Sequence, residues 1–143
     1  MLKQKFEAVG RLVAKPEMRY TGGGQAVANV RVAIEDGYFS ADEGKWISRT
    51  IWATLSFWGK LAEGVAEKGN KRDQIVFVGS LVYDAETGAP RVYERSDGSA
   101  GAKFEFRVTE YQLFPYAGNG GTPPTDSEDM QGAGPETADE IPF

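Results

Sequence analysis

Three tryptophans, Trp46, Trp52 and Trp58, recur at even spacing within one stretch, and they are all the tryptophan in the chain. Successive side chains of a strand point to opposite faces, so even spacing places the three indoles on one face. Hydroxyl side chains separate them on that face, whereas the opposite set is mostly apolar. A flat aromatic face can stack on nucleotide bases, because every base has a π-face. Indoles also pack beneath loops or at subunit interfaces, and this stretch alone favours neither interpretation.

Catalytic chemistry has little support in the sequence. The chain contains no His and no Cys, which excludes Ser-His and Cys-His nucleophiles as well as disulfides. Neighbouring carboxylates at 42–43 and 139–140 fall in segments expected to be loop or tail, where solvated acids are common. The acids at 126–129 lack the glycine and the spaced Glu of a calcium loop. We therefore expect no enzymatic activity, no cofactor and no metal site.

The charges are unevenly distributed along the chain. The formal net charge is −5, from 16 basic and 21 acidic residues. Six of the acids lie in residues 115–143, which contain no Lys or Arg, so residues 1–114 carry a net charge of +1. A near-neutral part followed by an acidic tail does not exclude a nucleic acid partner, whose phosphates Lys and Arg would neutralise.

The secondary structure expected from the sequence, which must position these residues, indicates an all-β fold with one short helix. Residues 60–68 have a helical period in Leu61 and Val65, and Gly69 stands where a helix ends. Five segments are typical of strands, and one such helix between the third and fourth strands matches the five-stranded OB-fold Greek-key barrel. The strands are expected at residues 4–13, 26–35, 46–58, 74–83 and 102–113.

Finer expectations follow from the alternation of side chains. In the strand 46–58, Ala53, Leu55 and Phe57 should face the core, and in the last strand Phe104, Phe106 and Val108 should do so. Residues 91–95 are expected to return as the second arm of a hairpin after strand 74–83. Arg49 should lie opposite the indoles, so Arg31 ranks above it as a phosphate contact. Val9, Val13 and Val76 should point away from the core and could be covered by another subunit.

The composition changes at Pro115. Residues 115–143 hold five of the seven prolines and no Leu or Val, which predicts a disordered tail after a folded domain of residues 1–114. The last residues place two acids before Ile141, Pro142 and Phe143. A partner protein could bind this tip, although a frayed end is the usual fate of such a segment.

Several short motifs together resemble the bacterial single-stranded DNA-binding proteins, including their phage-borne relatives. Each motif is weak alone, but their order, their spacing and the acidic Ile-Pro-Phe ending make the set specific. The motifs are Gly10-Arg-Leu, Pro16-Glu-Met-Arg-Tyr20, Gly24-Gln-Ala-Val-Ala-Asn29, Trp52 followed by Phe57-Trp-Gly-Lys-Leu-Ala-Glu63, Val78-Gly-Ser-Leu81 and Asp139-Glu-Ile-Pro-Phe143.

The resemblance implies an OB-fold homotetramer that binds single-stranded DNA without sequence preference in replication, repair and recombination. Trp52 matches the stacking Trp of that family, Trp58 falls where Phe is usual, and Tyr38 falls where many members have Trp. The family's DNA-binding hairpin corresponds to residues 82–95 and looks short here, with Tyr83 and Tyr93 where members often place a Trp. Trp46 has no counterpart that can be assigned.

From the residues and the resemblance together we expect one DNA-binding set and one partner-binding set. The first consists of Trp52, Trp58, Tyr38, Arg31, Trp46, Tyr83, Tyr93, Lys60, Lys5 and Arg91. The second consists of Asp139, Glu140, Ile141, Pro142 and Phe143, which would bind replication and repair proteins. The alternative is an OB-fold protein-interaction module without DNA binding. No leader and no membrane span stands out, so we expect a cytoplasmic, nucleoid-associated protein, in the host cytoplasm if a phage encodes it.

Overall fold

The structure is a computed structural model that describes residues 3–117. The described part contains ten strands and one helix, arranged as follows in chain order: β1 (Phe6–Leu12), β2 (Met18–Tyr20), β3 (Ala26–Glu35), β4 (Tyr38–Ser40), β5 (Lys45–Ile47), β6 (Thr50–Trp58), α1 (Lys60–Lys68), β7 (Gln74–Leu81), β8 (Val92–Glu94), β9 (Ala100–Ala102) and β10 (Phe104–Phe114). No helix within 3–117 is long and apolar enough to cross a membrane.

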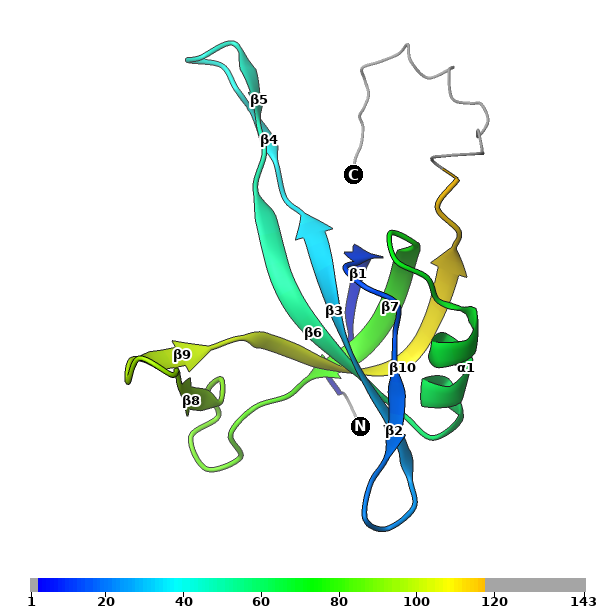
Figure 1. Cartoon of the computed structure of the whole chain (residues 1–143). Coiled ribbons are helices and arrows are strands. Elements are labelled where there is room, and N and C mark those ends of the chain that lie inside the picture. Colours follow the sequence, from blue (N-terminus) through cyan, green and yellow to red (C-terminus); the bar gives the residue numbers. More distant parts are fainter. Residues whose placement is uncertain (1–2, 118–143) are drawn as a thin grey trace.

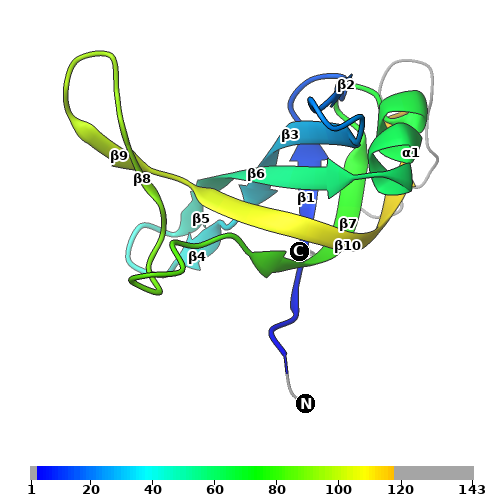
Figure 2. The ribbon, with the colours of Figure 1, turned by 90° about the horizontal axis from the view of Figure 1, so that it is seen from below.

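Five long strands close into a barrel, which confirms the predicted OB-fold. They pair in the order β1-β7-β10-β6-β3, and β1 also pairs with β3, so that the sheet returns to its own first strand. β10 and β6 run parallel, whereas the other pairs are antiparallel. α1 lies at one end of the barrel, and two hairpins, β4–β5 and β8–β9, project from it (Figures 1 and 2).

The core is built from alternate residues of the barrel strands. Leu55 and Phe57 of β6, Val32 of β3 and Phe77 of β7 are all completely buried. The ring of Phe57 meets that of Tyr111 edge-on, with their centroids 5.4 Å apart. The period-two prediction for β6 is thus confirmed over the barrel, and its outward set, starting with Trp52, faces away from the core.

Two glycines mark close approaches that the barrel requires. β1 leaves β7 and joins β3 near Gly10, where a Cβ atom would come within 3.2 Å of the Val32 Cβ. A Cβ at Gly64, inside α1, would lie 2.8 Å from the Tyr111 hydroxyl. A side chain at either position would require Val32 or Tyr111 to shift, which accounts for a glycine inside a strand and another inside a helix.

The predicted single strand 46–58 is in fact two strands, β5 and β6, with Ser48 and Arg49 outside both of them, although the Asp36 backbone N–H still donates to the Arg49 carbonyl oxygen at 2.8 Å. The register is nevertheless preserved, because Tyr38 pairs with Ile47 and Glu35 with Thr50, which skips two residues on each chain. At Gly37 the two chains approach too closely for a Cβ atom, which would lie 2.8 Å from the Ile47 carbonyl oxygen. Trp46 therefore belongs to a projecting ribbon and not to the barrel wall.

The hairpin expected after β7 is organised differently from the prediction. Residues 91–95 do not return along β7, because β8 pairs with β9. The reason is local: Gly98 has a φ of 89°, and the Ser99 backbone N–H donates to the Asp97 carboxylate (2.9 Å), which together make a tight turn. The projection consequently extends over residues 82–103, which is longer than the expected 82–95.

Phe104 was expected in the core with Phe106 and Val108, but it is 57% exposed. β7 ends at Leu81, opposite Phe106, so nothing from β7 covers the first residues of β10. Phe106 packs partly against the core and Val108 is buried, as predicted. β10 also starts two residues later than expected, because the residue expected at its start belongs to β9.

Candidate nucleic-acid interface

The outward residues of β6 form a flat polar and aromatic surface. Trp52 is 49% exposed, and Thr54, Ser56 and Trp58 are partly exposed, while the residues between them are buried. β3 is antiparallel to β6 and places Arg31 opposite Thr54, and Asn29 opposite Ser56. Cross-strand partners share a face of a sheet, so β3 extends this polar surface.

Each barrel tryptophan carries an arginine over its ring. The Arg31 guanidinium lies 4.9 Å from the Trp52 ring centroid, and that of Arg107 lies 5.4 Å from the Trp58 ring centroid. Such cation–π contacts orient the planar guanidinium beside the indole. The result is two positions at which a base-stacking surface and a phosphate-binding charge lie side by side.

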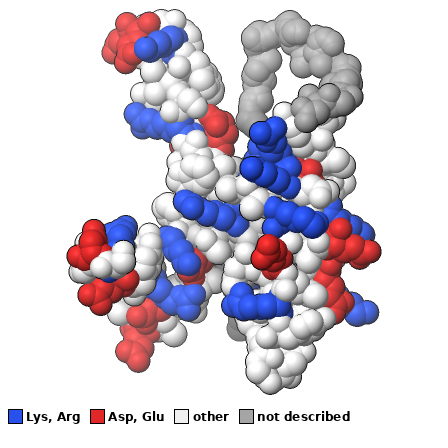
Figure 3. All heavy atoms as spheres, viewed as in Figure 1, with Lys and Arg blue, Asp and Glu red and all other residues white. Residues whose placement is uncertain are grey.

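A groove of about 450 Å³ runs along this surface. Basic side chains line it from three parts of the chain, namely β2, the β7–β8 connection and residues 103–107, which comprise Lys103 and the first part of β10. On the side viewed in Figure 3, Lys and Arg form a band across the barrel, while many acids lie at the projecting tips and beside α1. The groove is lined by Arg19, Thr21, Val27, Asn29, Thr54, Ser56, Trp58, Val82, Arg91, Lys103, Glu105, Phe106 and Arg107.

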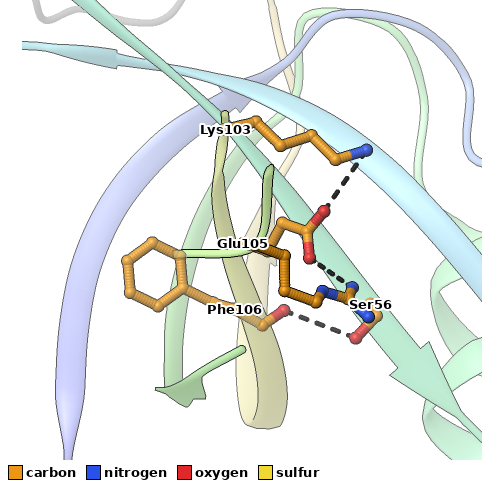
Figure 4. Close-up of polar contacts among 5 residues, drawn as sticks. Ser56, Lys103, Glu105 and Phe106 are labelled. Atoms are coloured by element: carbon orange, nitrogen blue, oxygen red, sulfur yellow. Dashed lines mark hydrogen bonds and ion pairs between the residues drawn. The ribbon is translucent and has the colours of Figure 1, made fainter. Parts of the chain in front are cut away.

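One carboxylate lies inside this groove. Glu105 accepts a hydrogen bond from the Arg91 guanidinium at 2.6 Å and forms an ion pair with the Lys103 ammonium at 3.3 Å (Figure 4). Burial alone would raise the pKa of Glu105, but the hydrogen bonds and charges of Arg91 and Lys103 outweigh it and lower this pKa below its ordinary value. Glu105 is therefore ionised at neutral pH. The Ser56 hydroxyl meanwhile donates to the Phe106 carbonyl oxygen at 3.5 Å.

The β4–β5 ribbon carries a second exposed aromatic group. Phe39 is 62% exposed and Trp46 57% exposed, and the two are cross-strand partners. Tyr38 is placed by Arg49, whose guanidinium lies 5.0 Å from the ring centroid and donates to the hydroxyl at 3.3 Å. Arg49 thus lies beside Tyr38, one of the residues predicted to bind DNA.

The β8–β9 projection carries two exposed tyrosines of the predicted set. Tyr83 precedes β8, and Tyr93 lies within it, with the Arg95 guanidinium 5.9 Å from the Tyr93 ring centroid. Arg91 lies in the groove, where its guanidinium forms an ion pair with Glu105. Three predicted cations do not line the groove: Arg31 lies over Trp52, Lys60 begins α1, and Lys5 lines another hollow beside β7.

Sequence reasoning missed Arg19 altogether and left Lys103 and Arg107 outside the final set. Arg19 pairs with Val27, which pairs in turn with Trp58, so the register of three strands brings Arg19 to the same face as the indole. Lys103 comes to the groove through its pairing with Glu105. The pairing of strands reveals the position of Arg19 beside the indole, which the motif at residues 16–20 does not indicate by itself.

The chain leaves the barrel at a fixed point. Asp73 is 4% exposed and accepts backbone hydrogen bonds from Asn70 (2.9 Å) and Tyr116 (3.0 Å). Two guanidinium groups lie near the Tyr116 ring, with centroid distances of 5.9 Å to Arg11 and 5.5 Å to Arg72. A truncation that tests the tail should therefore keep Tyr116. The predicted partner-binding tip, residues 139–143, lies outside the described residues.

Comparison with known proteins supports one family. The model of the single-strand binding protein family matches residues 3–114. A single-stranded DNA-binding protein of Corynebacterium glutamicum is 33% identical over 116 residues, which cover 78% of this chain and 52% of that protein. One of Paenarthrobacter aurescens is 30% identical over 127 residues, covering 88% of this chain and 70% of that protein. The chain thus spans about half the length of the first relative.

Two solved structures share the fold. The crystal structure of a small single-stranded DNA-binding protein from Streptomyces coelicolor matches with a TM-score of 0.63 and 19% identity, covering 78% of this chain and 94% of that one. A deletion mutant of the single-stranded DNA-binding protein from Thermus aquaticus matches with a TM-score of 0.59 and 22% identity. The match covers 78% of this chain and 50% of that one. At sequence identities of 19% and 22%, the similarity to these two structures shows a shared fold.

Proposed function

The chain belongs to the single-strand binding protein family, and from that premise we propose that it binds single-stranded DNA without sequence preference. The observation that carries the proposal is the pairing of Trp52 with Arg31 and of Trp58 with Arg107 on one outward face. Stacking on an indole accepts any base, and an adjacent guanidinium can meet the phosphate that follows it. The groove beside Trp58 offers further cations for the backbone.

Single strands should be preferred to duplexes, because the π-face of a base is free for stacking on Trp52 or Trp58 only when the base is unstacked from its neighbours. Replication, repair and recombination are the processes in which such a protein would act. The exposed aromatic residues of the two projections, Tyr38, Trp46, Tyr83 and Tyr93, extend the surface available to a longer strand. Lys5 and Lys60 are proposed only as peripheral phosphate contacts.

The direct test is binding of fluorescently labelled oligo-dT at increasing salt concentration. Cations that neutralise phosphates release counterions, so the logarithm of the affinity should fall linearly with the logarithm of salt, by roughly 0.7 for each phosphate neutralised on a single strand. A duplex of the same length should bind more weakly. No binding of oligo-dT at low salt would contradict the proposal and favour the protein-interaction alternative.

We further propose that the terminal residues 139–143 bind replication and repair proteins. Ile141 and Phe143 would need an apolar pocket, the terminal carboxylate a Lys or Arg, and the acids Asp139 and Glu140 a basic rim. Deletion of Phe143 alone should remove those proteins from a bacterial-lysate pull-down, because the ring is the largest apolar group of the tip. Oligo-dT affinity should stay the same.

The control for this prediction is a chain that ends at residue 117 and so keeps the Tyr116 contacts. It should lose the same partners as the Phe143 deletion and bind oligo-dT as tightly or slightly more tightly, since six acids that repel phosphate are gone. Identical pull-downs from the intact chain and the Phe143 deletion would show that the tip has no such role. Loss of oligo-dT binding on truncation would place the tail inside the DNA site.

A homotetramer is the assembly that we propose. Val9 is 38% exposed, Val13 is 36% exposed, and Val76 pairs with Val9 on the neighbouring strand, so apolar side chains reach the outer surface here, with the exposed Arg11 between Val9 and Val13 in the sequence. β1 pairs with β7 over residues 6–11 but with β3 only at Arg11 and Leu12, so these apolar side chains lie on a sheet face beside a strand edge that is free at Val9. Covering such a face with another subunit removes apolar surface from water.

Sedimentation velocity at micromolar concentration tests the assembly. The expected species has four times the mass of the 15.6 kDa chain. Val9→Lys should shift the distribution toward smaller species, because each copy would bury an unpaired charge at the contact. A single-chain mass for the unaltered protein would contradict the tetramer.

A further inference from the structure

Glu105 is the one acid among the described residues that line the groove, and it lies between two of the groove's four cations. The other two cations, Arg19 and Arg107, form no ion pair with a described residue. Arg107 instead lies over Trp58. The groove therefore contains two cations that are free to meet an anion and two that already have one.

The carboxylate is held in place by the barrel. The Glu105 backbone pairs with Thr54 of β6, and its carbonyl oxygen accepts the Val82 backbone N–H at 2.9 Å. Its side chain is only 15% exposed, whereas those of Arg91 and Lys103 are 59% and 49% exposed. Glu105 is thus a fixed anion, and the two cations are long side chains that can turn toward another anion.

A phosphate oxygen presents the same chemistry to these cations as the Glu105 carboxylate does. Arg binds either group through charge-assisted hydrogen bonds, and Lys binds either as a point charge. A phosphate that enters the groove must therefore exchange with Glu105 for Arg91 and Lys103, and it meets the repulsion of the carboxylate while doing so. A phosphate that must displace the carboxylate from a cation gains less binding free energy than one that meets a free cation.

We propose that Glu105 acts as an internal competitor for phosphate, which occupies Arg91 and Lys103 and limits both the affinity and the salt dependence of binding to single-stranded DNA. This inference rests on the proposed function and assigns Glu105 a tuning role within the same groove. The groove behaves as a site of two free cations and two occupied ones. Its consequence is a binding surface that holds the backbone while still allowing it to be released or shifted.

The test is Glu105→Gln, which keeps the shape of the side chain and removes its charge. Oligo-dT affinity near 0.2 M salt should rise about 3- to 10-fold, and the slope of log affinity against log salt should steepen by up to roughly 1.4, that is 0.7 for each of two freed cations. The matched control is Glu110→Gln, on the same strand but in the hollow beside β7. It makes the same change in net charge and should leave the slope unaltered.

A double-mutant cycle with Arg91 strengthens the test. Arg91→Gln should change the salt slope by much less than 0.7 in the unaltered chain and by about 0.7 in the Glu105→Gln background. Circular dichroism and the thermal midpoint verify folding. Glu105→Ala serves as a second variant, which should also raise the oligo-dT affinity and steepen the salt slope. Additive effects of the two substitutions on the slope would contradict occupation of Arg91 by Glu105.

The outcomes separate this inference from the proposed function. If the unaltered chain binds oligo-dT and Glu105→Gln binds more weakly, or with an unchanged or shallower slope, the carboxylate positions the cations or contacts bases, and the inference is wrong. An equal gain from Glu110→Gln would reduce the effect to net charge and also overturn it. Failure of the unaltered chain to bind oligo-dT would instead refute the proposed function.

Discussion

Replacing Trp52 or Trp58 with Ala is expected to weaken oligo-dT binding by about 1–3 kcal/mol for each indole, roughly 5- to 150-fold in affinity. Each ring offers a stacking surface beside an arginine, so its removal takes away the base contact and also loosens Arg31 or Arg107. Titration of labelled oligo-dT measures the loss. Quenching of tryptophan fluorescence by DNA, strong in the unaltered chain, should decrease in both variants.

Trp52→Phe provides the matched control, because it keeps an aromatic ring at the same place and should recover part of the affinity. The unfolding transition should stay close to that of the unaltered chain, since 49% of Trp52 is exposed to solvent. Unchanged affinity in both alanine variants would rule out stacking by the β6 indoles. The interpretation that these tryptophans pack at a subunit interface would then be favoured, and a changed sedimentation profile would support it.

Phe57→Ala should have the largest effect on folding, lowering the free energy of unfolding by about 3–5 kcal/mol. Phe57 is completely buried, and its ring meets Tyr111 edge-on, so truncation leaves a cavity between β6 and β10. Small domains are stable by only about 5–15 kcal/mol, so this loss is a large part of the total. Urea denaturation without DNA measures it.

The neighbouring residue supplies the control for this prediction. Phe57 and Trp58 are adjacent on β6 but point to opposite faces. Trp58→Ala should change affinity far more than stability, whereas Phe57→Ala should change stability and weaken binding only in proportion to the unfolded fraction. A loss below about 1 kcal/mol for Phe57→Ala would contradict the core position, since buried Phe truncations cost several times more.

The alternation of residue types was enough to predict which face of β6 is buried, because the side-chain period of a strand is a local property. The helix Lys60–Lys68 and its end at Gly69 were likewise predictable, since helical periodicity and end glycines act within a few residues. The order of strands and helix then indicated the OB-fold barrel. Local patterns failed at Phe104, where β7 stops before it can cover the ring.

In the proposed DNA-binding surface, the sequence indicated the tryptophans, whereas the structure assigned an arginine to each of them. Trp52 and Trp58 could be chosen from the sequence, because the alternation of their strand places both on the outward face and Trp52 matches the stacking Trp of the family, while Trp58 falls where Phe is usual. Their partners Arg31 and Arg107 could not be assigned to particular rings. Arg107 reaches Trp58 through the parallel pairing of β10 with β6, two strands that are far apart in the sequence.

By itself, then, the sequence determined the fold class, the buried face of β6 and the residue types able to stack on bases. Only the tertiary structure decided which cation lies beside which ring, that β8 pairs with β9, and that Glu105 occupies Arg91 and Lys103 within the groove. The physical reason is that periodicity specifies the direction of a side chain relative to its own strand. Its neighbours depend on register between distant strands, which forms only when the barrel closes.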